Sequence, residues 1–517
     1  MSQELSPRRQ GLGPGFFDLD RAAGWAHALL RATSGRGWSI AAAGTLVIGG
    51  AAAGLHAPTS GAWFWHVANG ELISRHGLSG TALSLARPGA VLDLRSWLAD
   101  LGLFLIYRST GLVGLAVTGA VAGALIGGCL ILAIRATARS HPLVALLAGG
   151  LGLGALAPVI TDLSSELLAV LAALLVLTLT FAGRRSWWGA GAAVALIVVW
   201  TNSQADAGIA VVVIWGWVVL GHWDANRPGR PTAPSWWVIP LAGVALILSP
   251  RGIGAVAQLP LSLGMQGENP LLAAWSSINF HPWTARVAEL AGMVLLVAYW
   301  LAGSRLRRTD ALLGLGTGVL ALLWANYLPW FLVVAAVQSS WYLSVAWLPR
   351  GAVDGLAPTS SQRGGAGSHR AAVAAAIPIL IAILVLGSGL AAVSRRGGVS
   401  GQTKAQLPVQ AARWLAVHPA RGAWFTTPSF GDYLSSRFPS GHNLLCIDDP
   451  VPMAGAALGQ CEALAELNAG SLAILRSLGA KLAVLPRAAP AAAFLRAEGW
   501  EIRYRDPTTV VLAPRNL

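Results

Sequence analysis

Long apolar runs, separated by short polar segments, dominate the first 394 residues of the chain. A helix that crosses a bilayer needs about 20 mostly apolar residues, and these runs approach or exceed that length. The pattern therefore predicts α-helices that cross a membrane many times. The predicted spans are 38–55, 111–134, 142–160, 164–183, 186–201, 205–222, 236–249, 287–303, 310–326, 328–348 and 371–394.

One apolar piece, from Trp97 to Tyr107, is too short to cross a bilayer alone. It is either part of a longer helix or a helix lying in the membrane interface. The arginine distribution described below favours a membrane-lying helix at 92–108, whereas a missed hairpin would change the number of crossings. Together with the longer runs, this gives about 11–13 transmembrane helices.

The pattern changes near the C-terminus. Residues 351–370 are rich in Gly and Ser and predict a flexible linker before the last span. From about Gln406 the composition is that of a soluble domain, in which short strands alternate with helices. The predicted fold class is an α-helical polytopic membrane protein with a small C-terminal α/β domain at 405–517. Helices are expected at 409–417, 457–478 and 489–498, and strands at 444–447, 482–485 and 510–513.

Composition supports this division. The 517-residue chain is 55% hydrophobic and only 11% charged, whereas soluble chains are about 25% charged. The net charge is +14, but there is no basic face interleaved with exposed aromatics, so nucleic acid is not an expected partner. Three cysteines are too few for a disulfide scaffold or a cysteine-rich metal site.

Arginine clusters predict the topology, because positive residues favour the cytoplasmic side. Residues 1–37 form a basic, cytoplasmic N-terminal tail, and the membrane domain spans 38–394 with an external loop at 56–95. The domain at 405–517 is then extracytoplasmic, on a multi-pass protein of the plasma membrane; Arg395 and Arg396 argue against this placement. The other cytoplasmic clusters are 135–139, 184–185, 227–230, 305–308 and 350–370.

Polar segments gather on the predicted external side. Polar residues at membrane depth are costly and usually face a cavity. The sequence therefore predicts one external cavity, lined by loop 56–95, the turns 161–166 and 202–206, the loop 250–286, and residues 326–327.

Motifs along the chain resemble, in order, those of bacterial membrane glycosyltransferases of the GT-C type. The first external loop of that family reads roughly Asp-x-Trp-Trp-His, then Gly-x-x-Ile, Pro-Gly and Trp-Leu. The matching positions here are 63–66, 70–77, 88–89 and 97–98; later matches are 200–202, 249–252, 275–280, 430–434 and 447–448.

The resemblance implies transfer of a sugar from a polyprenyl-phosphate carrier to a cell-envelope acceptor on the external face. The family's acidic positions, however, fall on Ala62, on Thr81 or Ala82, and on Ala274. Two interpretations follow: other carboxylates substitute, or the chain is a non-catalytic relative that acts as an envelope scaffold or lipid-glycan binder. A transporter is disfavoured because no internal repeat is visible.

The candidate catalytic residues are Asp93, Asp162 and Glu166, carboxylates on the predicted external side that could accept a proton. No cofactor and no metal site are predicted. Several candidates have an alternative role: an Asp93–Arg95 surface ion pair, a helix cap at Asp162, and an interfacial aromatic helix around His66. Asn202 and Gln204 could be plain turn residues. The candidate substrate-binding residues are His66, Arg95, Asn202, Gln204 and Trp275.

A disulfide between Cys446 and Cys461 is a further prediction, because both lie in the domain placed outside the cytoplasm. The alternative is two buried, unpaired thiols. Cys129, inside a predicted span, is expected to be free.

Overall fold

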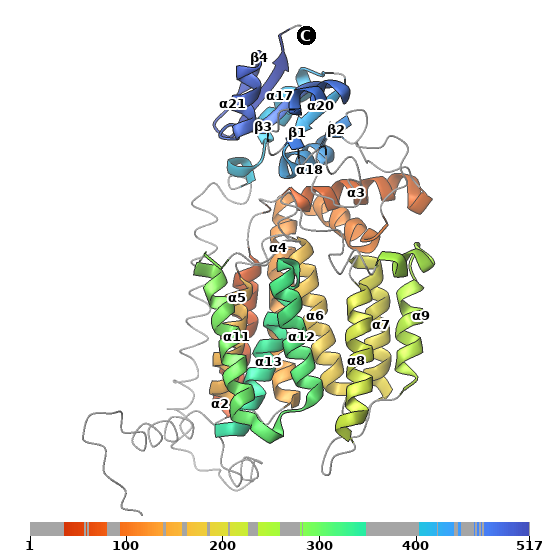
Figure 1. Ribbon diagram of the computed structural model, residues 1–517, viewed down its shortest axis with the longest axis vertical. Coiled ribbons are helices and arrows are strands. Elements are labelled where there is room, and N and C mark those ends of the chain that lie inside the picture. Colours follow the sequence, from red (N-terminus) through yellow and green to blue (C-terminus); the bar gives the residue numbers. More distant parts are fainter. Residues whose placement is uncertain are drawn as a thin grey trace, which may run out of the picture.

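In the computed structural model, a bundle of apolar helices stands beneath a small α/β domain, with one helix lying between them (Figure 1). This arrangement confirms the predicted fold class. The residues that the structure describes are 36–55, 58, 61–79, 94–137, 141–157, 163–182, 187–204, 207–225, 236–258, 280–281, 283–347, 403–420, 422–438, 443–445, 460, 463–464, 467 and 470–515.

Within these residues, four helical segments are long and apolar enough to cross a bilayer: Gly37–Gly54, Trp97–Arg135, Ala207–Asp224 and Ala285–Arg305. Shorter apolar helices stand beside them in the bundle. The predicted last span, 371–394, and the linker 351–370 lie outside the described residues. The bundle helices are α2 (Arg36–Gly54), α4 (Trp97–Thr137), α5 (Pro142–Leu156), α6 (Leu163–Ala182), α7 (Trp187–Ser203), α8 (Ala207–Ala225), α9 (Val238–Ile247), α11 (Trp283–Ala302), α12 (Arg308–Leu323) and α13 (Leu328–Trp347).

Short 3-10 segments accompany several of these helices. They are η1 (Gly77–Ser79), η2 (Gly252–Gln258), η4 (Gly303–Arg305) and η5 (Ala325–Tyr327).

Helix α4 is interrupted at Gly111, whose φ of 66° and ψ of −150° are not helical. Glycine adopts a positive φ without the steric penalty that a Cβ would add. The segment before Gly111 is therefore distinct from the membrane-crossing segment after it. This break falls at the boundary predicted between the short apolar piece near 97–107 and the span beginning at 111.

Helices α2 and α4 pack through glycines. A Cβ built on Gly50 would lie 2.1 Å from the carbonyl oxygen of Gly123, and one on Gly54 would lie 2.0 Å from that of Gly119. Small residues let membrane helices approach backbone to backbone. The two helices on either side of the first loop are thus fixed to each other.

Helix α3 (Ala62–His76) lies across the top of the bundle, beneath the α/β domain. Its length is 15 residues, and both faces are covered: Trp63, Phe64 and Ile73 are all buried. It therefore forms part of the packing between the two halves of the molecule.

The α/β domain is built on a five-stranded mixed sheet of order β2-β1-β3-β5-β4. Strand β1 pairs in parallel with β2 and β3, whereas β5 is antiparallel to both β3 and β4. The strands are β1 (Ala423–Thr426), β2 (Asn443–Leu445), β3 (Ala480–Pro486), β4 (Trp500–Arg505) and β5 (Thr509–Pro514); the helices are α17 (Val409–Val417), α18 (Pro428–Arg437), α20 (Ser471–Ser477) and α21 (Pro490–Ala497).

The predicted elements β2, β3, β5, α17 and α21 are present, but three others were not predicted: β1, α18 and β4. The predicted continuous helix 457–478 is wrong, because Leu467 lies in a turn with a φ of 54° and α20 begins only at Ser471. A left-handed residue cannot continue a right-handed helix.

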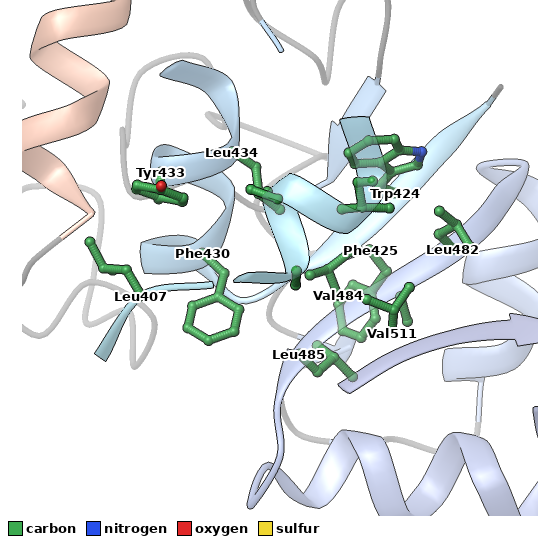
Figure 2. Close-up of a cluster of buried hydrophobic side chains, with 14 of the residues drawn as sticks. Leu407, Trp424, Phe425, Phe430, Tyr433, Leu434, Leu482, Val484, Leu485 and Val511 are labelled. Atoms are coloured by element: carbon green, nitrogen blue, oxygen red, sulfur yellow. The ribbon is translucent and has the colours of Figure 1, made fainter. Parts of the chain in front are cut away.

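One hydrophobic core runs from the sheet into the membrane domain. It joins Trp424, Val484 and Val511 of the sheet to Phe430 and Leu434 of α18 (Figure 2). The same core includes Trp63, Phe64 and Val67 of α3 and Leu115 of α4. The ring of Phe64 meets that of Tyr433 edge-on, with centroids 4.9 Å apart.

Polar contacts reinforce this junction. The backbone N–H of Gly61 donates to Oγ of Ser429 across 3.1 Å, and Oγ1 of Thr403 donates to the carbonyl oxygen of Pro58. A Cβ on Gly61 would lie 2.1 Å from the backbone oxygen of Ser429. The α/β domain thus holds the N-terminal end of α3.

Candidate functional site

The first turn of α4 contacts α3 on one side and the end of α7 on the other. Helices α3 and α4 cross so closely at Gly70 that a Cβ there would lie 2.1 Å from the backbone oxygen of Asp100. This close approach brings the polar side chains of α3 to the start of α4.

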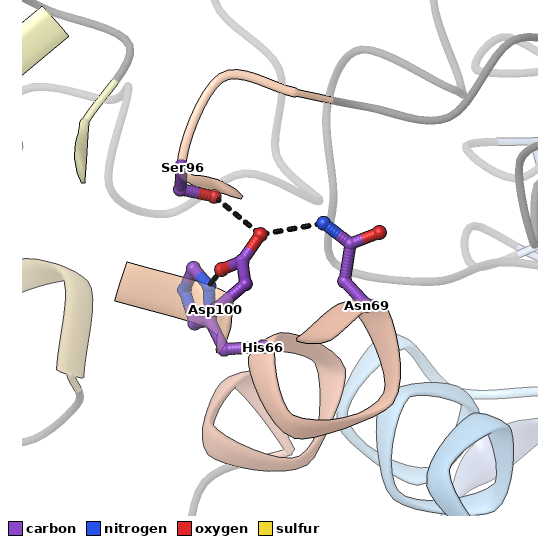
Figure 3. A network of polar contacts seen from close by, with 4 residues as sticks. All are labelled: His66, Asn69, Ser96 and Asp100. Carbon is purple, nitrogen blue, oxygen red and sulfur yellow. Dashed lines mark hydrogen bonds and ion pairs between the residues drawn. The ribbon is translucent and has the colours of Figure 1, made fainter. Parts of the chain in front are cut away.

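Asp100 is fully buried, and among the described residues the side chains of His66, Asn69 and Ser96 contact its carboxylate (Figure 3). Nδ1 of His66 lies 2.5 Å from Oδ1, whereas Nδ2 of Asn69 and Oγ of Ser96 donate to Oδ2 across 2.5 Å and 3.0 Å. His66 and Asn69 are three residues apart on α3, so they share one helix face. The buried carboxylate is therefore well satisfied, as a buried charge requires.

The carboxylate fixes the orientation of the His66 ring. Because Nδ1 faces Asp100, the opposite ring nitrogen, Nε2, points away from it. The His66 side chain is 13% exposed, whereas that of Asp100 is fully buried. The pair therefore has a buried carboxylate end and an imidazole end nearer the surface.

Asn202, at the end of α7, forms the second polar contact of this turn. Nε1 of Trp97 donates to its Oδ1 across 2.6 Å. Its Nδ2 donates to the carbonyl oxygens of Val198, at 2.7 Å, and Leu248, at 2.9 Å. The Asn202 amide thus joins the start of α4 to α7 and to the residue after α9.

Two buried donors belong to residues beside the Asn202 contacts: Trp330 packs on Trp200, and Ser249 follows Leu248. The Trp330 ring packs against Trp200, with centroids 5.0 Å apart. Nε1 of Trp330 and Oγ of Ser249 are both buried without a hydrogen-bond partner in the described part of the chain. Buried polar groups usually have partners, so these two are available to a ligand or a water.

The structure brings together some of the predicted site residues. His66 and Asn202 contact the same turn of α4, through Asp100 and Trp97 respectively. Arg95 is 9% exposed and lies just before that turn. Gln204 follows α7 and is half-buried, with its backbone N–H on the carbonyl oxygen of Trp200.

The remaining candidates are not placed. Asp93, Asp162 and Trp275 lie outside the described residues, as do Cys446 and Cys461. Glu166 belongs to α6, but its side chain also lies outside what the structure describes. Cys129 is free and buried, as predicted for a cysteine inside a span. No group of three or more His, Cys, Asp or Glu residues in the described ranges is arranged to hold a metal ion.

Sequence reasoning missed the central role of Asp100. The local signal was present, since a carboxylate inside the otherwise apolar piece 97–107 is costly unless it is paired. Its partners His66 and Asn69 lie 34 and 31 residues away, so the pairing becomes visible only in the fold.

Comparison with solved structures identifies the class of fold. The chain superposes on the apo form of the Archaeoglobus fulgidus oligosaccharyltransferase with a TM-score of 0.50 and 11% identity, covering 87% of this chain and 70% of that one. The chain therefore has the GT-C membrane glycosyltransferase fold that the motifs predicted.

Two further structures are similar at lower scores. ArnT from Cupriavidus metallidurans, in the apo state, has a TM-score of 0.45 and 15% identity, covering 95% of this chain and 98% of that one. Archaeoglobus fulgidus AglB in complex with an inhibitory peptide and a dolichol-phosphate has a TM-score of 0.47 and 11% identity, with 87% and 69% covered. No protein-family model matches the sequence, and no curated protein matches it significantly.

Proposed function

We propose that the protein is a membrane glycosyltransferase that moves a sugar from a polyprenyl-phosphate carrier to a cell-envelope acceptor, on the external face of the plasma membrane. Its fold is that of an enzyme named as an oligosaccharyltransferase. The ordered motifs support the same class of reaction. The arginine clusters support placing α3, the start of α4 and the α/β domain on the external side.

The observation that carries the proposal is the His66–Asp100 pair at 2.5 Å. A histidine whose second nitrogen faces a buried carboxylate is held in one orientation and is stabilised when it gains a proton. Such a histidine is a suitable general base near neutral pH. Asp100, which is fully buried, acts through His66 as a positioning residue.

In the proposed reaction, His66 accepts the proton of the acceptor hydroxyl as that oxygen bonds to the anomeric carbon of the sugar. The bond between the anomeric carbon and the phosphate oxygen breaks at the same time, and polyprenyl phosphate leaves with the electron pair. Arg95 would hold the lipid phosphate, since arginine binds phosphate strongly. Asn202, Gln204 and Trp275 would contact the sugar or the acceptor, and Asp93, Asp162 or Glu166 would supply a further carboxylate.

The test is a transfer assay with the purified full-length chain, radiolabelled polyprenyl-phosphate sugars and envelope-glycan acceptors. Loss of general-base catalysis typically costs about 100-fold or more, so His66→Gln should lower kcat by at least that factor. Asp100→Asn should lower kcat and shift the acidic limb of the pH profile, because the imidazolium loses its counter-charge. Glu71→Gln, also on α3 but paired with exposed Arg75, is the matched control. Full turnover by His66→Gln would reject the mechanism.

A second candidate is a non-catalytic lipid-glycan binder or envelope scaffold. It is favoured by Ala62, which begins α3 where the family has an acidic residue. Wild-type protein that binds polyprenyl-phosphate sugars, with no turnover across the acceptor panel, would support this alternative.

A further inference from the structure

A small pocket opens where the α/β domain meets α3 and α4. It encloses about 90 Å³, and its lining includes Phe64, Leu112 and Tyr433. Three cations line it: Lys404, Arg413 and Arg437. The pocket is distinct from the site around Asp100, whose residues do not line it.

Among the residues that the structure describes, no carboxylate forms an ion pair with any of the three cations. Arg437 is held by Tyr433 instead: its Nε donates to the phenol oxygen across 3.2 Å, and its guanidinium lies 5.6 Å from the ring centroid. All three side chains are exposed, so a ligand can reach them. The charge of the pocket is thus complementary to an anion.

An exposed apolar surface begins at the same place. Leu112, in the pocket, directly follows Gly111, where α4 is interrupted. Four apolar residues at intervals of four then run down α4 with exposed fractions of 50–61%: Val113, Val117, Val121 and Leu125. Residues four apart lie along one side of a helix. An exposed apolar stripe thus begins one residue after the pocket residue Leu112.

We propose that this pocket binds the headgroup of an anionic membrane phospholipid, whose acyl chains lie along the α4 stripe. The phosphate would contact Lys404, Arg413 and Arg437, because arginine and lysine near a membrane surface attract anionic headgroups. Because α17 and α18 supply two of the cations and α4 supplies the stripe, the lipid would bind both halves of the molecule. The inference is independent of the proposed transferase activity.

The test is lipid binding to the full-length chain, delipidated in neutral detergent and titrated with phosphatidylglycerol while bound lipid is counted by native mass spectrometry. Each cation near a surface contributes roughly a fivefold factor in affinity. The double variant Lys404→Gln/Arg413→Gln should therefore weaken binding by roughly tenfold or more, and adding Arg437→Gln should take the loss toward a hundredfold. The double variant leaves the Arg437–Tyr433 contact intact, so it keeps the test valid if the triple variant misfolds.

The matched control is Lys481→Gln/Arg487→Gln/Arg496→Gln, which removes three exposed cations of the same domain that do not line the pocket. Support requires that this control binds like wild type and that phosphatidylcholine binds at least tenfold more weakly. Equal loss in the control and pocket variants would overturn the site. Displacement by inorganic phosphate at the concentration of the phosphatidylglycerol would show a site for free phosphate. Preferential displacement by polyprenyl phosphate would show a site for the carrier. Either result would overturn the assignment to a phospholipid.

Discussion

Nε1 of Trp97 lies 2.6 Å from Oδ1 of Asn202, although 105 residues separate them in the chain. The contact joins the first turn of α4 to the end of α7. The next polar residue of the same turn, Asp100, contacts His66 of α3. The first turn of α4 therefore sets the relative positions of His66 and Asn202, both of which were predicted from the sequence to contact substrate.

Asn202→Ala should destabilise the protein, because the Trp97 N–H and the carbonyl oxygen of Leu248 each lose a partner. Leaving a polar group unsatisfied costs about 1–3 kcal/mol when it is fully buried, and less for these part-buried groups. Trp97→Phe should cost less, because it leaves only the Asn202 oxygen without a partner. Thermal unfolding in detergent would measure both, and an unchanged melting temperature in Asn202→Ala would contradict this account.

Gly50→Ala should separate α2 from α4, because the new Cβ would lie 2.1 Å from the carbonyl oxygen of Gly123. Overpacking of this kind typically costs about 1–3 kcal/mol. The neighbouring variant Gly49→Ala is the control, since a Cβ there meets nothing within 4 Å. Thermal unfolding should show a lower melting temperature for Gly50→Ala alone. Equal melting temperatures for the two variants would refute the close packing.

Phe64→Ala should loosen the α/β domain from the membrane domain. Phe64 is buried in the shared core and packs against Tyr433, and truncating a buried phenylalanine costs about 3–5 kcal/mol. Limited proteolysis should then cut near the junction sooner than in wild type. The control is Leu78→Ala, whose side chain is 41% exposed. Identical digestion of both variants would argue against a structural role for Phe64 at the junction.

Asp224→Ala should destabilise the start of α12. The Asp224 carboxylate accepts from the backbone N–H groups of Arg308 and Thr309 and from the Thr309 hydroxyl. Removing it leaves helix N-terminal donors unpaired, at a cost of about 1–3 kcal/mol. Asp224→Asn keeps one oxygen acceptor, so it should lower the stability of this helix start by less. Amide hydrogen exchange in residues 308–311 would report the change, and wild-type protection in both variants would contradict it.

The disulfide between Cys446 and Cys461 stays a prediction. If it forms, thiol labelling of the denatured, unreduced protein should modify only Cys129. Closing a loop of about 15 residues would stabilise the domain by about 3 kcal/mol in the chain-entropy model. Three labelled cysteines would exclude the bridge.

The sequence predicted the bundle helices of the described residues well, because each is an apolar run bounded by polar or basic residues. The break in α4 was also predictable, since the short piece ending at Tyr107 and the run beginning at Gly111 are separated by Arg108, Ser109 and Thr110. In the α/β domain, β1 (Ala423–Thr426) was missed because all four of its residues are buried, so it shows no alternation of apolar and polar positions.

The candidate site was less predictable. His66 and Asn202 were singled out by motif, but Asp100 was not, because its flanking residues indicated only an apolar piece near the interface. Its role depends on the crossing of α3 and α4 at Gly70, which is a tertiary contact without a local sequence signature.

The shared core of the sheet, α18 and α3 has a consequence for how this chain can be divided. The surfaces of α3 and of the α/β domain are buried against each other through Phe64 and Tyr433, although the two elements lie far apart in the chain. Grafting the last hundred residues onto a related membrane domain would transfer only one side of this shared hydrophobic core. Domain exchange between relatives should therefore succeed only when α3 is exchanged together with the C-terminal domain. The exchangeable unit is thus made of two segments that are separate in sequence.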